Sequence, residues 1–346
     1  MLQDLIDSVP DDLPPIEQTS HLKPLDRPAQ FAFFQQNGEC FKVTSTPDSK
    51  FVRANRSYLR DWLATNLDVQ WDKHMTKIEE TDKSVTLFFL DGTSATGDVL
   101  VGADGVHSPT RAHLCESKNL LQTVPVGMIG GETTLNREQY ESVMEIGNSA
   151  FLARGEVFNI FVGLNSVAED ASTAKYYWMF NWVDEKAAQE PYWTASASKQ
   201  ELYDYAMKHI DAFDPKFVEV VRLTPVDGVR TPPLVLRDLV LKEMPNRRVT
   251  LVGDAAHPMT PFRGQGGNEA IKDSLNLARA IAKSTKTDFL PALKEYQEEM
   301  LVRGGEAVIK SREAIADGGT LTKQVWQSFT SRQRQQPSLT EAVKAH

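Results

Sequence analysis

One aspartate in this sequence stands where open α/β sheets bind their ligands. Residues 249–252 (VTLV) predict a short buried strand, and Asp254 follows at its carboxyl end. A loop rich in proline and glycine then leads into an amphipathic helix. Three loop residues, Gly264, Gly266 and Gly267, lack the Cβ atoms that would keep a ligand away from the backbone. Because the first N–H groups of a helix are unpaired and its dipole is positive there, the segment predicts a site for an anion or a polarised carbonyl.

A second unit of the same kind lies at residues 98–111. Residues 99–101 predict a strand that ends at Gly102, and Asp104 with the next glycine predicts a tight turn. Ser108 is expected to cap a helix whose first residue is Pro109. An isolated Asp-Gly pair usually does no more than shape such a turn. Two units, each with an acid at the end of a strand, instead favour a single crevice built from both.

Local sequence patterns predict the helices and strands that must hold these two units. Residues 2–9 have helical spacing, and Asn37-Gly38 predicts a hairpin between residues 31–36 and 40–46. Residues 52–67 predict an amphipathic helix that carries Arg56, for which a solvated surface arginine is the simplest interpretation. Residues 85–90 and the turn Asp91-Gly92 predict a further hairpin arm.

The middle of the chain has a different amino-acid composition. From about 120 to 230 it is aromatic and β-rich, as in residues 156–164 and 175–183, which favours a mostly antiparallel sheet. Residues 202–213 predict a helix within it. Its aromatic side chains could line a substrate pocket, although such residues more often form core: Tyr176, Tyr177, Trp178 and Trp182.

The C-terminal part is expected to begin with a long amphipathic helix at residues 290–316. The residues expected to be buried there are Leu293, Tyr296, Met300 and Ile309. The polar, glutamine-rich stretch from Gln324 onward is expected to be partly disordered.

Composition excludes several classes of protein. The 346 residues are 41% hydrophobic and 25% charged, which is ordinary globular material with room for two lobes. A formal net charge of −9 without a basic block argues against nucleic acid or an anionic membrane as the main partner. No apolar run is long enough to span a bilayer, and the acidic N-terminus does not resemble a signal peptide. Cys40 and Cys115 lack metal-ligand spacing and favour packing roles in a reducing, cytoplasmic compartment. The scattered histidines predict no metal site.

The two motifs together resemble those of flavin-dependent aromatic monooxygenases of the para-hydroxybenzoate hydroxylase type. The closest branches are the tetracycline-inactivating enzymes and the fungal enzymes of secondary metabolism. VLVGADGVHSPTR resembles the family's Asp-Gly motif, and LVGDAAHPMTPFRGQGGNEAIKDSLNLA its Gly-Asp motif. The resemblance covers residues 1–316, firmly at the motifs and loosely between them.

This resemblance implies a role for each matching residue. Asp254 would hydrogen-bond the ribityl chain of non-covalently bound FAD, Arg56 would contact FAD, and Asp104 would serve both flavin and NAD(P)H binding. The loop residues would lie along the isoalloxazine ring, with the last two at its pyrimidine edge: Pro261, Gly264, Gly266, Gly267 and Asn268. The positive helix end would stabilise negative charge on the reduced flavin. The implied activity is hydroxylation or epoxidation of an aromatic or polycyclic small molecule, with NAD(P)H and O₂ as co-substrates.

One family feature has no counterpart in this sequence. The family begins with a βαβ unit whose G-x-G-x-x-G turn binds the FAD pyrophosphate, and no such turn occurs before Arg56. Three explanations stay open: a truncated product of a monooxygenase gene, which we favour; a relative with a binding or non-redox role; or a fold completed by a partner chain.

The expected fold is therefore α/β (α+β), with an incomplete FAD-binding Rossmann-like domain, an inserted antiparallel substrate domain and a C-terminal helix. The expected boundaries are 1–118 with 231–289, then 119–230, then 290–346. The sequence assigns no catalytic residue, and it leaves the substrate, the choice between NADH and NADPH, and the oligomeric state open.

Overall fold

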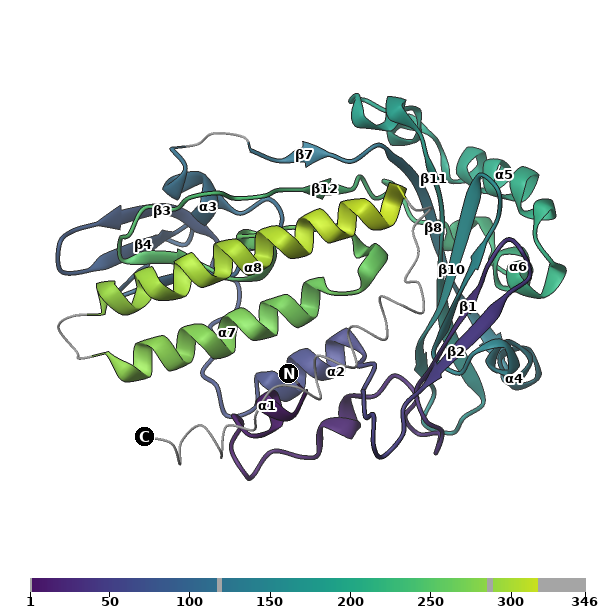
Figure 1. Ribbon diagram of the computed structural model, residues 1–346, viewed down its shortest axis with the longest axis horizontal. Coiled ribbons are helices and arrows are strands. Elements are labelled where there is room, and N and C mark those ends of the chain that lie inside the picture. The colour runs from purple at the N-terminus through teal and green to yellow at the C-terminus, as the bar shows by residue number, and fades with distance from the viewer. Residues whose placement is uncertain (1, 117–119, 285–288, 317–346) are drawn as a thin grey trace.

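The computed structural model describes residues 2–116, 120–284 and 289–316, and the polar stretch from Gln324 lies outside them. The described chain forms two halves side by side (Figure 1). One half is a twisted sheet backed by helices, and the other packs two long helices against several small sheets.

The larger sheet has six strands in the order β2-β1-β9-β10-β11-β8. Their bounds are β1 Gln30–Phe34, β2 Cys40–Thr44, β8 Val126–Asn136, β9 Ala150–Arg154, β10 Phe158–Val167 and β11 Thr173–Val183. All neighbouring pairs are antiparallel except β1 with β9. Three helices lie on its outer face (Figure 1): α4 Arg137–Ile146, α5 Lys199–His209 and α6 Pro215–Arg222. The main hydrophobic core lies between this sheet and these helices, and the predicted antiparallel sheet is confirmed.

The other half contains three small sheets. The antiparallel sheet β3-β4-β5 consists of Met75–Glu80, Val85–Phe89 and Ser94–Gly97. The pair β6 (Leu100–Gly102) and β13 (Val249–Leu251) is parallel, and the pair β7 (Gln122–Thr123) and β12 (Arg237–Asp238) is antiparallel. The helices of this half are α1 Leu2–Ile6, α2 Arg56–Leu63, α3 Pro109–Leu114, α7 Gly266–Lys283 and α8 Leu290–Ala316. Short 3-10 helices occupy Ile16–Thr19, Glu185–Ala188, Trp193–Ser196, Ile210–Ala212, Val226–Gly228, Gly253–Ala255 and Pro261–Arg263.

The N-terminal hairpin forms where the sequence predicts it, with Gly38 at φ +84° in its turn. Its place in the molecule differs from the expectation. β1 pairs with β9, so that Phe31 lies opposite Ala150, and the hairpin is part of the six-stranded sheet. The sheet therefore draws strands from residues 30–44 as well as from the segment 119–230.

The long C-terminal helix is confirmed, with one correction to its buried face. Leu293, Tyr296 and Met300 are buried as predicted, but Ile309 is 46% exposed and Val308 is fully buried instead. At about 100° per residue, Ile309 lies about 180° around the helix from Met300, whereas Val308 is much closer to the inner face. The prediction for Ile309 was wrong because it followed residue type and not helical phase.

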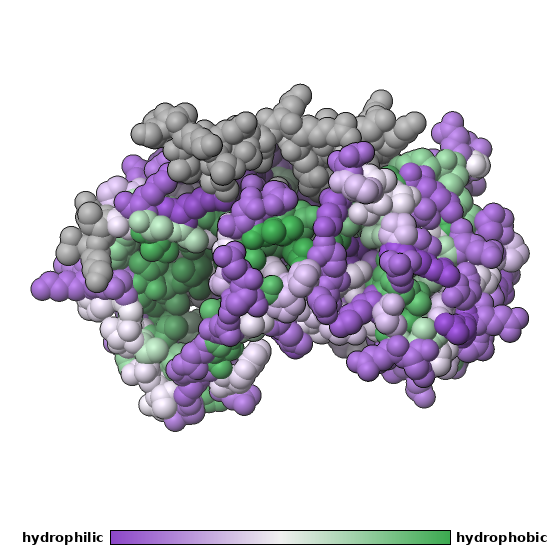
Figure 2. Space-filling view, turned by 90° about the horizontal axis from the view of Figure 1, so that it is seen from below, coloured by the Kyte–Doolittle hydropathy of each residue, from purple (hydrophilic) through white to green (hydrophobic). Residues whose placement is uncertain are grey.

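The parallel sheet is small. Within the residues that the structure describes, β6 and β13 have only each other as strand neighbours. Val101 on β6 and Ile281 on α7 are exposed apolar side chains in this half. Figure 2 shows apolar residues in recesses between polar rims, the largest of them over this half of the molecule. No helix in the described ranges combines the length and the apolar character needed to cross a membrane.

Candidate functional site

The two predicted strand-and-acid units lie next to each other. β6 and β13 pair in parallel, with Leu100 opposite Val249 and Gly102 opposite Leu251. The carboxyl ends of both strands therefore meet at one edge, as the sequence predicted for a single crevice. Gly102 is required there because a Cβ would lie 2.7 Å from Thr110 and 2.9 Å from Leu251.

A buried arginine joins the two units. Arg111, on α3, is only 6% exposed and donates hydrogen bonds to the carbonyl oxygens of Val106 and Ala255. It also reaches the carbonyl of Asp254 at 3.4 Å. The sequence pattern does not predict this role for Arg111, since a helix arginine without a marked partner looks like a surface residue.

Asp254 follows a turn that only glycine adopts easily. Gly253 has φ +59°, and a Cβ at that position would lie 2.9 Å from Ala270. Asp254 is exposed, and within the described residues its carboxylate accepts no hydrogen bond. Partial burial raises its pKa, while His257 and Arg56 act in the opposite direction. Arg56, exposed at the first turn of α2, thus lies near Asp254 although the two are far apart in sequence.

The loop after Asp254 ends at an open helix terminus. Pro261 begins a single 3-10 turn, and Gly264 closes it in the left-handed conformation at φ +60°. In the described part of the chain, no side chain caps the first N–H groups of α7. Among the described residues, a Cβ on Gly264 or Gly267 would meet nothing within 4 Å, so this terminus has free space beside it. A Cβ on Gly266 would lie 3.8 Å from Oδ1 of Asp254. The side-chain amide of Asn268 donates a hydrogen bond to the side-chain oxygen of Gln265.

The structure gives Asp104 a local role. Its carboxylate accepts hydrogen bonds from the Ser108 hydroxyl and from both the backbone N–H and the hydroxyl of Thr110. Ser108 caps α3, and Pro109 is its first residue, as predicted. The contacts of Asp104 therefore agree with the simpler turn-shaping interpretation, and its contribution to cofactor binding stays a prediction.

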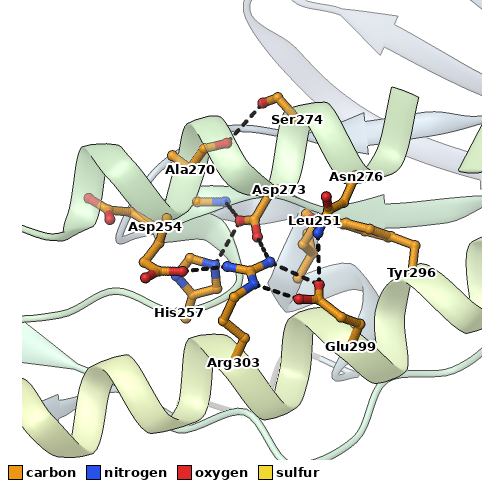
Figure 3. Close-up of polar contacts among 12 residues, drawn as sticks. Leu251, Asp254, His257, Ala270, Asp273, Ser274, Asn276, Tyr296, Glu299 and Arg303 are labelled. Carbon is orange, nitrogen blue, oxygen red and sulfur yellow. Dashed lines mark hydrogen bonds and ion pairs between the residues drawn. The ribbon is translucent and has the colours of Figure 1, made fainter. Parts of the chain in front are cut away.

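A buried polar network supports the turn at Asp254 from behind. Figure 3 shows Asp273, which projects from α7, between His257 and Arg303. Its Oδ2 accepts hydrogen bonds of 2.7 Å from the Gly253 N–H and from His257 Nε2. Its Oδ1 accepts a 2.7 Å hydrogen bond from Arg303 Nη2 of α8. Asp273 is fully buried, so this network fixes the residue that precedes Asp254 to both long helices.

Arg303 is shared by three acidic side chains in this network. Arg303 also bonds Glu269 and Glu299, and these acids raise its pKa despite its burial. For Asp273, burial alone would raise the pKa, but the His257 and Arg303 contacts and the Gly253 N–H hold it below its usual value. Nε2 of His257 donates to the Asp273 carboxylate, and its buried Nδ1 has no partner within the described residues. In the sequence His257 is recognisable only as part of the motif, and no local pattern predicts the roles of Asp273 and Arg303.

A cavity of about 850 Å³ lies between the two halves, beside Arg56. The start of α2 and strands β8, β10 and β11 contribute to its walls, which include Arg53, Arg56, Met128, Leu164, Tyr177 and Trp178. Of the four aromatic residues that the sequence suggested, Tyr177 and Trp178 adjoin it, but the Trp178 side chain is only 1% exposed and donates a hydrogen bond to Thr224 in the core. Tyr176 and Trp182 are buried core residues.

The described residues fit the flavin and ribityl portions of FAD. The fit rests on three features: open space at Gly264 and Gly267, an uncapped helix terminus, and the unoccupied carboxylate of Asp254 with Arg56 nearby. The sequence contains no G-x-G-x-x-G turn for the pyrophosphate, so the fit concerns this half of the cofactor. Within the described ranges, no group of three histidine, cysteine or acidic side chains is placed to hold a metal ion.

Comparison with known proteins agrees with this assignment. A family described as "FAD binding domain" matches residues 54–311. The FAD-dependent monooxygenase thnD of Trichoderma harzianum is 37% identical over 325 residues, which cover 90% of this chain and 80% of that protein.

Solved structures share the fold. A putative FAD-containing monooxygenase from Photorhabdus luminescens superposes with a TM-score of 0.69 at 22% identity, covering 90% of this chain and 84% of its own. Klebsiella pneumoniae HpxO, crystallised with FAD and uric acid, superposes with a TM-score of 0.67 at 20% identity, covering 89% and 76%.

Proposed function

Because the chain belongs to the FAD-binding family of flavin-dependent monooxygenases, we propose that it hydroxylates or epoxidises an aromatic or polycyclic small molecule. Its co-substrates would be O₂ and NAD(P)H, and its setting would be cytoplasmic secondary metabolism. One oxygen atom would enter the substrate and the other would leave as water, with two electrons taken from NAD(P)H. Neither nucleic acid nor a membrane is required as a partner.

The observation that carries this proposal is that Asp254 lies beside the uncapped start of α7 and feels the charge of Arg56, which lines the cavity. The Gly253 turn directs Asp254 toward solvent, where its carboxylate is free to accept hydrogen bonds from ribityl hydroxyls. Arg56 supplies a positive charge on the same side. The open terminus of α7 supplies N–H donors for a flavin carbonyl.

Each part has a separate task in the reaction. FAD, when bound, supplies the redox chemistry that joins NAD(P)H oxidation to oxygen activation. Asp254, Arg56 and the backbone at Gly264, Gly266 and Gly267 would hold and orient it, with Pro261 and Asn268 beside the ring. The α7 dipole would stabilise negative charge on the reduced ring. The cavity walls at Tyr177 and Met179 would orient the substrate and exclude water.

The test begins with an absorbance spectrum of the purified protein, with and without added FAD. We expect the visible flavin bands to stay with the protein after gel filtration. NADH and NADPH oxidation would then be compared in the presence and absence of candidate aromatic substrates. A folded preparation that never retains FAD would contradict the redox function and favour a binding or non-redox role.

A further inference from the structure

One arginine in the cavity carries a positive charge that no acidic side chain neutralises within the described residues. Arg53 is half-buried and lies just before α2. Its two terminal nitrogens donate to the Leu164 carbonyl and, at 2.8 Å, to the Tyr177 hydroxyl. Another cavity arginine, Arg230, differs because it forms an ion pair with Glu132.

The surrounding residues hold the Arg53 guanidinium in one place. It lies 6.0 Å from the ring centroid of Phe31 and 5.8 Å from that of Tyr177, within the range of cation–π attraction. Gly163, on β10, makes the room: a Cβ there would lie 2.8 Å from Tyr177 and 2.9 Å from Arg53 Nη2. A glycine, two rings and two fixed acceptors thus build a site for this cation.

The pair retains donors for a ligand. A guanidinium has five N–H groups, and two bonds to protein acceptors leave the others unused. The Tyr177 oxygen accepts from Arg53, and its own proton has no acceptor within the described chain. Two converging donors, one of them charged, match an oxyanion better than a neutral group.

The neighbouring histidine adds no competing charge. His21 is 1% exposed, and its Nδ1 lies 2.5 Å from the Arg53 carbonyl oxygen. Because a carbonyl only accepts, Nδ1 carries the proton. Burial and the Arg53 charge lower the His21 pKa to about 3, so this residue is neutral near pH 7. Arg53 is therefore the fixed charge at this point of the cavity wall.

From this arrangement we infer that the substrate carries a carboxylate, which binds between Arg53 and the Tyr177 hydroxyl. The inference rests on the proposed function, since it names the class of substrate for the same cavity. The aromatic body of such a substrate would lie along the half-buried side chains of Tyr177 and Met179, which also line the cavity. The position at which the substrate is oxidised would then depend on the distance between the anionic group and the flavin.

The test uses two probes that differ only in charge: 1-hydroxy-2-naphthoate and 1-hydroxy-2-naphthamide. Calorimetric titration of the full chain in the presence of FAD gives both dissociation constants without requiring turnover. We expect the carboxylate to bind at least about tenfold more tightly than the amide. Arg53→Gln should bring this ratio to about one, and Tyr177→Phe should reduce it about threefold.

Arg230→Gln is the matched control, because it removes a cavity arginine that is already paired, and it should leave the ratio unchanged. Circular dichroism tests whether each variant is folded. If Arg53→Gln does not fold, the ratio measured with Tyr177→Phe decides whether the inference stands. A wild-type ratio near one would overturn the inference. So would variants that weaken both probes equally, because that result indicates a purely structural pair. Loss of flavin binding or of NAD(P)H oxidation bears instead on the proposed function, so the two failures are distinguishable.

Discussion

Replacing Asp273 by asparagine tests whether this buried carboxylate holds the turn at Asp254 in place. Oδ2 receives two hydrogen bonds, from the Gly253 N–H and His257, and Oδ1 receives one from Arg303. Asparagine has a single acceptor oxygen. In its best orientation it keeps the two bonds at Oδ2 and turns its NH₂ group toward the guanidinium of Arg303.

The expected loss follows from this geometry. One hydrogen bond to a charged group is lost, worth about 1.5–3 kcal/mol, and two donors then face each other. Arg303 keeps Glu269 and Glu299, so the loss should stay below the roughly 3–5 kcal/mol of a buried charge left alone. We therefore expect Asp273→Asn to lower the free energy of unfolding by about 2–3 kcal/mol.

The pH dependence gives the prediction its sign. The folded-state pKa of Asp273 lies below its usual value, because the contacts with His257 and Arg303 outweigh the opposing effect of burial. Ionised Asp273 therefore stabilises the fold above the unfolded pKa, near about 3.9, and this stabilisation is lost as pH falls through the lower folded pKa. The difference between wild type and variant should be complete above about pH 5 and should shrink below about pH 3.

Urea unfolding of the purified chain without FAD, followed by circular dichroism across this pH range, measures the difference. Tyr296→Phe is a suitable control, since it removes a 2.8 Å hydrogen bond from α8 to the Leu251 carbonyl without touching Asp273. It should cost about 1 kcal/mol at every pH in the range. An Asp273→Asn protein within about 0.5 kcal/mol of wild type at pH 7 would refute the reasoning.

Three further predictions concern the site and its support. Asp254→Ala should weaken FAD binding by about tenfold, measured by flavin fluorescence titration, with little loss of stability because the side chain is exposed and makes no hydrogen bond within the described chain. Asp254→Asn should raise the thermal midpoint of the apoprotein at pH 7 but not at pH 3: a raised folded pKa means that ionisation destabilises the fold as pH rises. Gly304→Ala should destabilise by about 1–3 kcal/mol in urea unfolding, since its Cβ would lie 2.4 Å from His257. The adjacent Gly305→Ala, whose Cβ would meet Val240 at 3.4 Å, should be neutral or stabilising.

Each of these has a contrary outcome. Unchanged FAD affinity in Asp254→Ala would remove that residue from the cofactor site. Equal effects of Asp254→Asn at both pH values would mean that its ionisation is not linked to folding. Equal effects of Gly304→Ala and Gly305→Ala would show that the His257 ring does not constrain α8.

Local signals predicted the elements of the site well. The strand before Asp254, the Ser108 cap of α3 and the turn at Asn37-Gly38 all depend on side chains within a few residues of one another. Such signals act between residues close in sequence, so the local structure they predict does not depend on how the rest of the chain packs. They failed where helical phase mattered, at Ile309, and they did not show that the N-terminal hairpin pairs with β9.

The sequence by itself therefore determined the family motifs and the acid at the end of the strand, but not what holds or surrounds that acid. The pairing of β6 with β13 and the anchoring of Gly253 by Asp273 needed the tertiary structure. So did the contact between Arg53 and Tyr177, which are 124 positions apart. The reason is physical: hydrogen bonds between residues distant in sequence depend on how two elements pack, and packing is a property of both elements together and not of either pattern alone.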